Sequence, residues 1–198
     1  SDVADVYLQN KASRTPSKDY SRTPSKDYIE HSGTMEEYGK NPVFRIITVS
    51  IQKGQLHEAE TEVLVNTVSA NLDFTSGTIF ASLLKKAGPG LKKEISNKFK
   101  SPPQYGKVMK TGACHLPCKA IYHGALKPYH DQDDSVPIFR QFLLECLQQA
   151  SKSKYKSIAF PAIGTGKLGY PKDMVADLML TSVIRFEKSM PNTFLKEV

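Results

Sequence analysis

The sequence predicts an α/β fold in three layers, with helices covering both faces of a central sheet. From Asn41 onward, short apolar segments rich in β-branched residues alternate with longer segments of helical periodicity. One short segment, "SIAFP" (157–161), is apolar throughout, which is typical of a strand buried on both faces. A chain of 198 residues that is 39% hydrophobic can form one such core. We therefore expect one monomeric domain over residues 41–198.

Five segments are predicted as strands, the first of them because it is rich in β-branched residues. They are "VFRIITVSI" (43–51), "EVLVN" (62–66), "KVMKTGA" (107–113), "AIYHGAL" (120–126) and "SIAFP" (157–161). Open α/β sheets bind ligands beyond the carboxyl ends of their strands. The loops that follow "VLVN" and "SIAFP" are therefore the candidate ligand loops.

Three segments have apolar residues at helical spacing. In "TIFASLLKKAG" (78–88), Gly88 predicts the helix end, and the apolar face is formed by Ile79, Phe80, Leu83, Leu84 and Ala87. "SVPIFRQFLLECLQQAS" (135–151) tolerates Pro137 in its first turn, and its apolar face is formed by Phe139, Phe142, Leu143, Cys146, Leu147 and Ala150. Pro171 is predicted to open a third helix, "PKDMVADLMLTSVIRF".

Residues 1–40 have a different composition and are predicted to form a flexible extension. The octapeptide "SRTPSKDY" (13–20) is repeated without change at 21–28, in a polar stretch that has no packed-core explanation. The chain has no apolar run of about 18 residues and no secretory signal, so no contact with a membrane is expected. Its three cysteines, an odd number without framework spacing, favour a nuclear or cytoplasmic protein with reduced thiols.

The net charge of +7 is unevenly distributed along the chain. Residues 1–40 hold six basic and seven acidic side chains, so residues 41–198 carry a net charge of +8. Between Lys85 and Lys110 only Glu94 opposes eight lysines, namely Lys85, Lys86, Lys92, Lys93, Lys98, Lys100, Lys107 and Lys110. Such a run suits a polyanion, either nucleic acid or a phosphorylated ligand, although a solvated helix face is the commoner explanation.

The loop "PAIGTGKLGYP" (161–171) contains G-x-G-x-x-G, but neither familiar nucleotide motif fits it. A dinucleotide fingerprint belongs to the first βαβ unit, whereas this one lies in the last quarter of the chain. A P-loop would need glycine where Pro161 stands and a hydroxyl residue where Leu168 stands. What remains is a glycine-rich turn before a helix, whose backbone N–H groups can bind an anion.

Taken together, these residues resemble the macrodomains, a family that binds ADP-ribose. "SIAFPAIGTGKLGYP" (157–171) is similar to the family's second ligand loop, F-P-x-[IL]-x-T-G-x-x-G-[YF]-P. "VLVNTVSANLDFTSGTIFASLLKKAGPGL" (63–91) resembles V-N-A-A-N-x-x-L-x-x-G-G-G-V-A, and "AIYHGALKP" (120–128) resembles V-I-H-x-V-G-P. The likeness covers residues 43–198 and is strongest to the tandem macrodomains of macrodomain-containing poly(ADP-ribose) polymerases. It implies a three-layer fold with a mixed sheet and a parent protein of the ADP-ribosyltransferase family.

The resemblance also implies a binding site. The backbone of residues 163–169 would bind the diphosphate, Tyr170 would pack near a ribose, and "KGQLH" (53–57) would contact adenine. Asn66, Ser69 and the turn Thr75-Ser76-Gly77 would lie around the distal ribose. The residues implied to contact ADP-ribose are Gln55, Leu56, Asn66, Ser69, Gly77, Thr78, Ile79, Ile163, Gly164, Thr165, Gly166, Lys167, Leu168, Gly169 and Tyr170. No cofactor, catalytic residue or metal is expected.

Several departures from the family pattern favour binding over catalysis. Gln55 replaces an aspartate that accepts the adenine amino group, so this contact lacks charge assistance. Ser69 replaces the asparagine that hydrolase members use to orient the distal ribose, and Thr75 and Ser76 replace glycines. "NTFLKEV" (192–198) resembles the beginning of the family's last strand, so the rest of that strand and the final helix, with an aromatic that stacks on adenine, would be missing.

Four functions remain open from the sequence. The leading hypothesis is recognition of ADP-ribose, free or protein-linked, without enzymatic activity. The alternatives are weak hydrolysis of ADP-ribose from modified side chains, a nucleic-acid-binding or scaffold module that uses Lys85–Lys110, and a degenerate domain without a ligand. A zinc site at Cys114, His115, Cys118 and His123 is disfavoured, because no second C-x-x-C pair completes four ligands.

Overall fold

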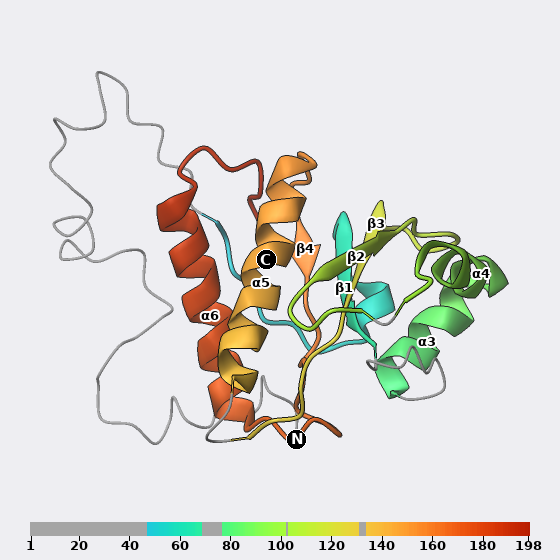
Figure 1. The fold of residues 1–198 in the computed structure, drawn as a ribbon. Coiled ribbons are helices and arrows are strands. Elements are labelled where there is room, and N and C mark those ends of the chain that lie inside the picture. The colour runs from blue at the N-terminus through green and yellow to red at the C-terminus, as the bar shows by residue number, and fades with distance from the viewer. Residues whose placement is uncertain (1–46, 69–76, 102, 131–133) are drawn as a thin grey trace, which may run out of the picture.

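Four strands form the central sheet of the computed structural model, in the order β2-β3-β1-β4 (Figure 1). Parallel pairing joins β1 to β3 and to β4, whereas β2 is antiparallel to β3. The strands are β1 (Val63–Thr67), β2 (Val108–Thr111), β3 (Ala120–Gly124) and β4 (Ile158–Ala159). The predicted mixed sheet is therefore confirmed. The structure describes residues 47–68, 77–101, 103–130 and 134–198, so the predicted extension 1–40 lies outside the described residues.

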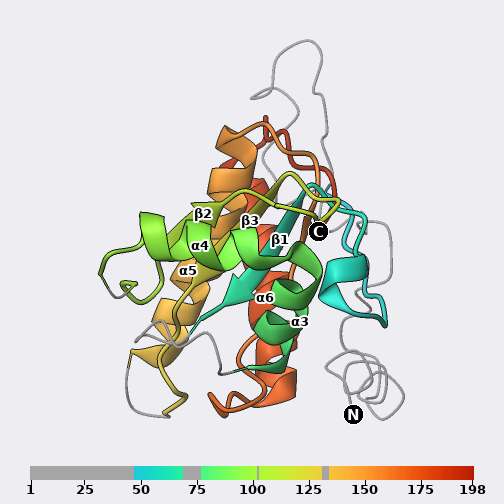
Figure 2. The same cartoon turned by 90° about the vertical axis from the view of Figure 1, so that its right-hand side faces the viewer.

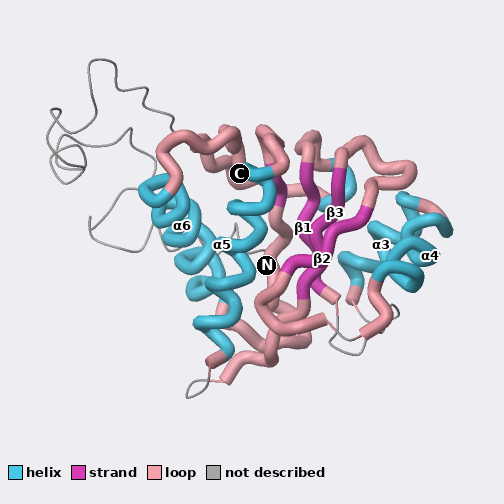
Figure 3. Tube along the Cα trace, turned by 45° about the horizontal axis from the view of Figure 1, so that its top comes forward, coloured by secondary structure: helices cyan, strands magenta, loops and turns pink. Residues whose placement is uncertain are grey.

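Two pairs of helices cover the two faces of this sheet, which gives the predicted three layers (Figures 1 and 3). One face is covered by α3 (Thr78–Ala87) and α4 (Pro89–Lys98), the other by α5 (Ser135–Lys152) and α6 (Lys172–Ser189). Each face has its own apolar cluster, because neighbouring residues of a strand point to opposite sides. Val63 and Val65 of β1 pack toward α5 and α6, and Leu64 packs toward α3 and α4.

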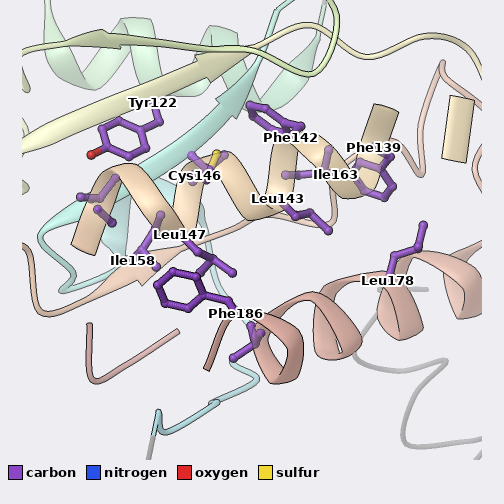
Figure 4. Close-up of a cluster of buried hydrophobic side chains, with 14 of the residues drawn as sticks. Tyr122, Phe139, Phe142, Leu143, Cys146, Leu147, Ile158, Ile163, Leu178 and Phe186 are labelled. Carbon is purple, nitrogen blue, oxygen red and sulfur yellow. The ribbon is translucent and has the colours of Figure 1, made fainter. Parts of the chain in front are cut away.

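The layer of α5 and α6 contains the larger cluster (Figure 4). All six residues of the predicted apolar face of α5 are buried, and Phe139, Phe142 and Cys146 are fully inaccessible to solvent. Gly124 of β3 lies directly beneath Phe142, since a Cβ atom at Gly124 would stand 2.0 Å from that ring. The aromatic ring thus fills the space that any larger residue at the end of β3 would need.

The layer of α3 and α4 differs from the prediction in one respect. The apolar face of α3 is confirmed, with Phe80, Leu83 and Ala87 buried. The sequence did not predict α4, because a proline and a glycine follow Gly88 and only two apolar residues, Leu91 and Ile95, are buried along it. A proline is nevertheless tolerated at the first position of a helix, where its missing N–H has no intrahelical partner.

The predicted strand 43–51 is not found in its described part. Residues 47–51 form a single parallel bridge, between Thr48 and Glu197, although Ser50 N–H also donates to Val198 O at 2.9 Å. Glu197 forms a second bridge to Ser157, so the C-terminal residues lie between that segment and the start of β4. The pairing is too short to form a strand.

The third helix begins at Lys172, and Pro171 caps it, one position from the predicted start.

No helix within the described ranges is long and apolar enough to cross a lipid bilayer.

Candidate ligand site at the carboxyl ends of β1 and β4

The glycine-rich loop joins the end of β4 to the start of α6 and is held by its own backbone. Tyr170 N–H donates to Gly164 O at 3.1 Å, and Gly169 N–H donates to Gly166 O at 3.0 Å. The Thr165 hydroxyl donates to Ala162 O at 2.9 Å, which ties the loop to its base. Gly164 and Gly169 have φ angles of +78° and +75°, a conformation that glycine adopts without strain.

These bonds leave a row of backbone donors without protein acceptors. Within the described residues, the N–H groups of Gly164, Gly166, Lys167 and Leu168 donate to no other group. Gly166 and Lys167 are also exposed to solvent. Consecutive N–H groups in a turn form a concave site for an anion. The arrangement agrees with the backbone donors that the sequence predicts for this loop.

Tyr170 lies beneath the loop rather than on its outer face. Its side chain is only 2% exposed and packs against Phe139, with ring centroids 5.0 Å apart. Its hydroxyl lies 3.0 Å from Lys127 O and 3.1 Å from Ser135 O, and it can donate to one of them at a time. A Cβ atom at Gly164 would stand 2.8 Å from the Tyr170 ring. Tyr170 therefore supports the loop from within the core, as Ile163 does, and the ribose contact implied for it stays a prediction.

A cavity of about 920 Å³ lies next to the base of this loop. Its walls come from residues 49–61, from α3, from the end of β4 and from α6. It brings together Gln55, Leu56 and Ile79, three of the predicted site residues, with Phe160, Pro161 and Ala162. Sequence reasoning did not single out Phe160, Pro161 and Ala162 by side chain, although they belong to the motif "SIAFPAIG".

Gln55 is positioned by a contact with α3. Its amide oxygen lies 3.4 Å from the Ser82 hydroxyl, which also lies 3.0 Å from Nδ1 of His57. These contacts tie the 3₁₀ turn Leu56–Glu58 to the outer side of α3. His57 and Ser82 carry no motif, so only the folded chain reveals that they support this wall of the cavity.

Asn66 occupies the end of β1 but does not line the cavity. The pairing of Leu64 with Ala159 carries Asn66 to the level of Pro161, beside the start of the glycine loop. Asn66 is 1% exposed; its Nδ2 lies 3.4 Å from Nδ1 of His123, and its Oδ1 has no partner among the residues that the structure describes. The side chain thus points into the α3–α4 side of the sheet, where β3 supplies the histidine.

His123 is enclosed at the centre of this buried polar group. Its Nε2 lies 2.8 Å from the Thr111 hydroxyl, and the rings of Phe80 and Phe99 pack edge-on against it. Burial lowers the pKa of His123 to about 3, although the charge of Glu94 opposes this shift. The neutral ring therefore accepts from Asn66 at Nδ1 and donates to Thr111 from Nε2.

The cysteine and histidine cluster does not assemble a metal site in the part of the chain that the structure describes. Three or more His, Cys, Asp or Glu side chains are nowhere gathered there in a way that could hold an ion. Both ring nitrogens of His123 already have partners. Burial raises the pKa of the Cys118 thiol to about 11, so it remains protonated at neutral pH.

Three predicted contact residues, Ser69, Gly77 and Thr78, belong to the first ligand loop and its junction with α3. Ser69, with Thr75 and Ser76, lies outside the described residues. Gly77 precedes α3 with a φ angle of +106°, and Thr78 is the first residue of that helix. The rim of the first ligand loop therefore stays a prediction.

Comparison with known families identifies the fold. The profile of the Macro domain family matches residues 65–179, a range that includes both candidate ligand loops. The chain therefore belongs to the Macro domain family. The macrodomain of Oceanobacillus iheyensis, solved with ADP, has a TM-score of 0.68 and 25% identity, and the match covers 80% of this chain and 85% of that chain. The macrodomain resemblance found in the sequence is confirmed.

Relatives of known sequence include mono-ADP-ribosyltransferases and O-acetyl-ADP-ribose deacetylases. Human protein mono-ADP-ribosyltransferase PARP14 is 34% identical over 148 residues, and mouse protein mono-ADP-ribosyltransferase PARP9 is 32% identical over 144 residues. These matches cover 74% and 73% of this chain, which spans only 8% and 16% of those proteins. An O-acetyl-ADP-ribose deacetylase of Enterobacter cloacae is 30% identical over 148 residues, covering 72% of this chain and 81% of that protein.

Proposed function

We propose that this domain recognises ADP-ribose, free or attached to a protein, and does not cleave it. The observation that carries the proposal is a set of N–H groups, at Gly164, Gly166, Lys167 and Leu168, that have no acceptor among the described residues. A diphosphate offers several acceptor oxygens and a negative charge, which match fixed backbone donors. The O. iheyensis macrodomains solved with ADP and with ADPR, each 25% identical to this chain, support the same ligand class.

The cavity beside the loop suits the adenosine end of such a ligand. Its volume of about 920 Å³ lies within the usual range of small-molecule sites. Leu56, Ile79 and Phe160 supply apolar surface for a base, and the Gln55 amide can form a hydrogen bond to it. In this arrangement Asn66 orders the end of β1 and contacts the ligand less directly than the loop does.

The side chains around the loop support binding over catalysis. Residues 161–171 contain no carboxylate, imidazole or thiol that could activate water, and the Thr165 hydroxyl already donates to Ala162 O. His123, the one buried imidazole among the described residues, is neutral and fully enclosed. General acid–base catalysis requires such a group within hydrogen-bonding reach of the substrate.

Titration calorimetry with ADP-ribose tests the proposal. A Cβ atom at Gly166 meets nothing within 4 Å, so Gly166→Glu is accommodated by the fold and places a carboxylate over the donors. Gly90→Glu is the matched control, because it makes the same change in the first turn of α4. We expect wild type and Gly90→Glu to bind equally, and Gly166→Glu to bind at least tenfold more weakly, about 1.4 kcal/mol. Equal affinity in all three would refute the site, and no binding by wild type would refute the function.

The relation to an O-acetyl-ADP-ribose deacetylase favours hydrolysis as a second candidate function. We expect no multiple turnovers on ADP-ribosylated protein or on O-acetyl-ADP-ribose. Turnover that is abolished by Asn66→Ala would replace the binding proposal with the enzymatic one.

The similarity to PARP14 and PARP9 supports a place for this domain within a larger protein of the ADP-ribosyltransferase family. The three cysteines are free thiols, which suits a nuclear or cytoplasmic reader of ADP-ribosylation.

A further inference from the structure

The positive charge of the chain is concentrated in the layer formed by α3, α4 and the segments that follow them. Residues 77–119 contain nine lysines and one acidic residue, Glu94, which gives nine minus one, a net charge of +8. The whole chain of 198 residues has a net charge of only +7. This layer lies on the outside of the molecule and faces the viewer in Figure 2.

Four of these lysines have no partner among the residues that the structure describes. Lys85 and Lys86 lie in the last turn of α3, Lys92 and Lys93 lie in α4, and all four are exposed. We call these four residues the lysine corner. The other five lysines each have a partner. Three form ion pairs, Lys98 with Glu94, Lys107 with Glu145 and Lys119 with Glu62. The other two form hydrogen bonds, Lys110 with the Tyr155 hydroxyl and Lys100 with Ser96 O.

Helix stability explains one half of the lysine corner and leaves the other unexplained. Lys85 and Lys86 lie in the last turn of α3, where the helix dipole favours a cation. Lys92 and Lys93 lie near the beginning of α4, where the dipole favours an anion, and the first turn of α4 contains no acidic residue. Lys92 and Lys93 are the fourth and fifth residues of this helix, just past its first turn, so the helix dipole gives their charge no stabilisation.

The turn between the two helices holds the lysine pairs in a fixed arrangement. Gly88 has a φ angle of +81°, and its N–H donates to Leu84 O at 3.0 Å. His115 N–H donates to Ala87 O at 3.3 Å, and its ring lies 2.9 Å from the position of a Cβ atom at Gly88. Leu91 is fully buried and anchors the start of α4. One lysine pair therefore stands on each side of a defined corner.

We propose that the lysine corner is a second binding surface, which contacts the phosphate backbone of a nucleic acid. Protein interfaces need apolar or aromatic anchors at their centre, and no large apolar residue is exposed on α3 or α4 in the described structure. Affinity at this surface must come from charge, and charge supplies most of the binding free energy in contacts with nucleic-acid phosphates. Lysine ammonium groups act as point charges without a fixed fork of donors, so the binding is independent of base sequence.

This surface is distinct from the glycine loop in its chemistry. The loop uses backbone N–H groups, which bind only at short range, whereas the lysine corner uses mobile charges that salt screens. The glycine loop joins β4 to α6, whereas the lysine corner lies on α3 and α4, so nucleic acid and ADP-ribose are expected to bind without competing. The inference does not depend on the ligand proposed for the loop.

Fluorescence anisotropy with a labelled DNA duplex of about 20 base pairs tests the inference, over salt concentrations of about 50 to 200 mM. The test variant replaces the four residues of the lysine corner by glutamine. The control variant replaces four other exposed lysines, Lys152, Lys154, Lys156 and Lys196, and loses the same net charge. Loss of four phosphate contacts is expected to reduce the slope of log affinity against log salt by about 3 to 4 in the test variant, and by less than about 1 in the control.

Folding and ligand binding are checked on the same proteins. All four substitutions are at exposed positions, so the unfolding midpoint and the affinity for ADP-ribose are expected to stay as in wild type. Gly90→Glu, which adds a carboxylate between the lysine pairs, is expected to weaken duplex binding, and Gly166→Glu to leave it unchanged. Equal loss in the test and control variants, displacement of the duplex by ADP-ribose, or equal binding of polyglutamate at the same charge would each overturn the inference.

Discussion

Two regions of the molecule pack a glycine against an aromatic ring, and they differ in how firmly the ring is held. At the glycine loop, Gly164 lies against Tyr170, and at the lysine corner, Gly88 lies against His115. Both glycines have positive φ angles, +78° and +81°. The Tyr170 ring is buried and hydrogen-bonded to the backbone, whereas His115 is exposed. The ring beside Gly164 is therefore fixed by the core, whereas the ring beside Gly88 is not.

This difference corresponds to two ways of attracting an anion. A locked loop keeps backbone dipoles in one geometry, which selects a ligand of defined shape and loses little with added salt. A corner with mobile lysines attracts any regular polyanion, and salt weakens it. We therefore expect a fixed aromatic ring beneath a site for a small ligand, and no such ring beneath a site for a long one.

The largest expected effect distinguishes the two glycines. Gly164→Ala is expected to cost about 3 kcal/mol or more, because backbone strain adds to the displacement of a fixed ring. Gly88→Ala is expected to cost about 2 kcal/mol, from strain alone, since the exposed His115 ring can rotate away. Urea unfolding at neutral pH measures both values. If His115→Ala relieved the cost of Gly88→Ala, the ring at the corner would be as fixed as the one at the loop.

The second expected effect is a loss of stability in acid that originates on the α3–α4 side of the sheet. The pKa of His123 is lowered to about 3 by burial, below its usual 6.5. Between about pH 3 and pH 6.5 His123 therefore binds a proton in the unfolded chain but not in the folded chain. The free energy of unfolding therefore falls as pH falls, by about 1.4 kcal/mol per pH unit. Hydrogen bonds from Lys98 and from Gly112 N–H lower the pKa of Glu94, so its contribution is lost below about pH 4.5.

The opposite side of the sheet has no such sensitivity among its buried titratable groups within the described ranges. Burial raises the pKa of Tyr122 to about 12 and raises that of Cys146 well above its usual value, so both are neutral in acid. Hydrogen exchange near pH 4 is expected to show α3 and α4 opening before α5 and α6. In His123→Gln the free energy of unfolding should depend less steeply on pH, by about 1.4 kcal/mol per pH unit between the folded and unfolded pKa values of His123. An unchanged slope would contradict the assignment.

The smallest expected effect compares the two rings themselves. Tyr170→Phe removes a hydroxyl that bonds to Lys127 O or Ser135 O, and is expected to cost about 1 kcal/mol. It should also weaken binding of ADP-ribose, because the loop loses part of its support. His115→Ala removes an exposed side chain and is expected to change stability by less than about 0.5 kcal/mol. Thermal unfolding measures the loss of stability in both variants, and calorimetry measures their affinity for ADP-ribose. Equal losses of stability in Tyr170→Phe and His115→Ala would show that the two rings do not differ in how firmly they are held.

Much of the fold could be predicted because its signals are local. The apolar face of α5 repeats with helical spacing, and every one of its six predicted residues is buried. The glycine loop was located from its own residues, since a buried strand, closely spaced glycines and a following helix lie in one stretch of sequence. α4 was missed because its two buried residues are too few to establish a period.

The parts that could not be predicted depend on contacts between distant residues. Asn66 and His123 are 57 positions apart, and only the pairing of β1 with β3 brings their side chains together. The environment of Tyr170 is set by Phe139 of α5 and by the carbonyls of Lys127 and Ser135, while the ribose contact implied for it stays a prediction. No pattern within the loop records these neighbours.

The sequence by itself determined the class of fold, the position of the glycine loop and the sign and location of the charge. These properties follow from residue type and spacing along the chain, which folding does not alter. Only the tertiary structure decided which N–H groups of the loop stay unpaired, which lysines lack a partner among the described residues, and that His123 is buried and neutral. Each of these depends on which groups compete for the same space and the same hydrogen bonds, and that competition exists only once the layers have packed.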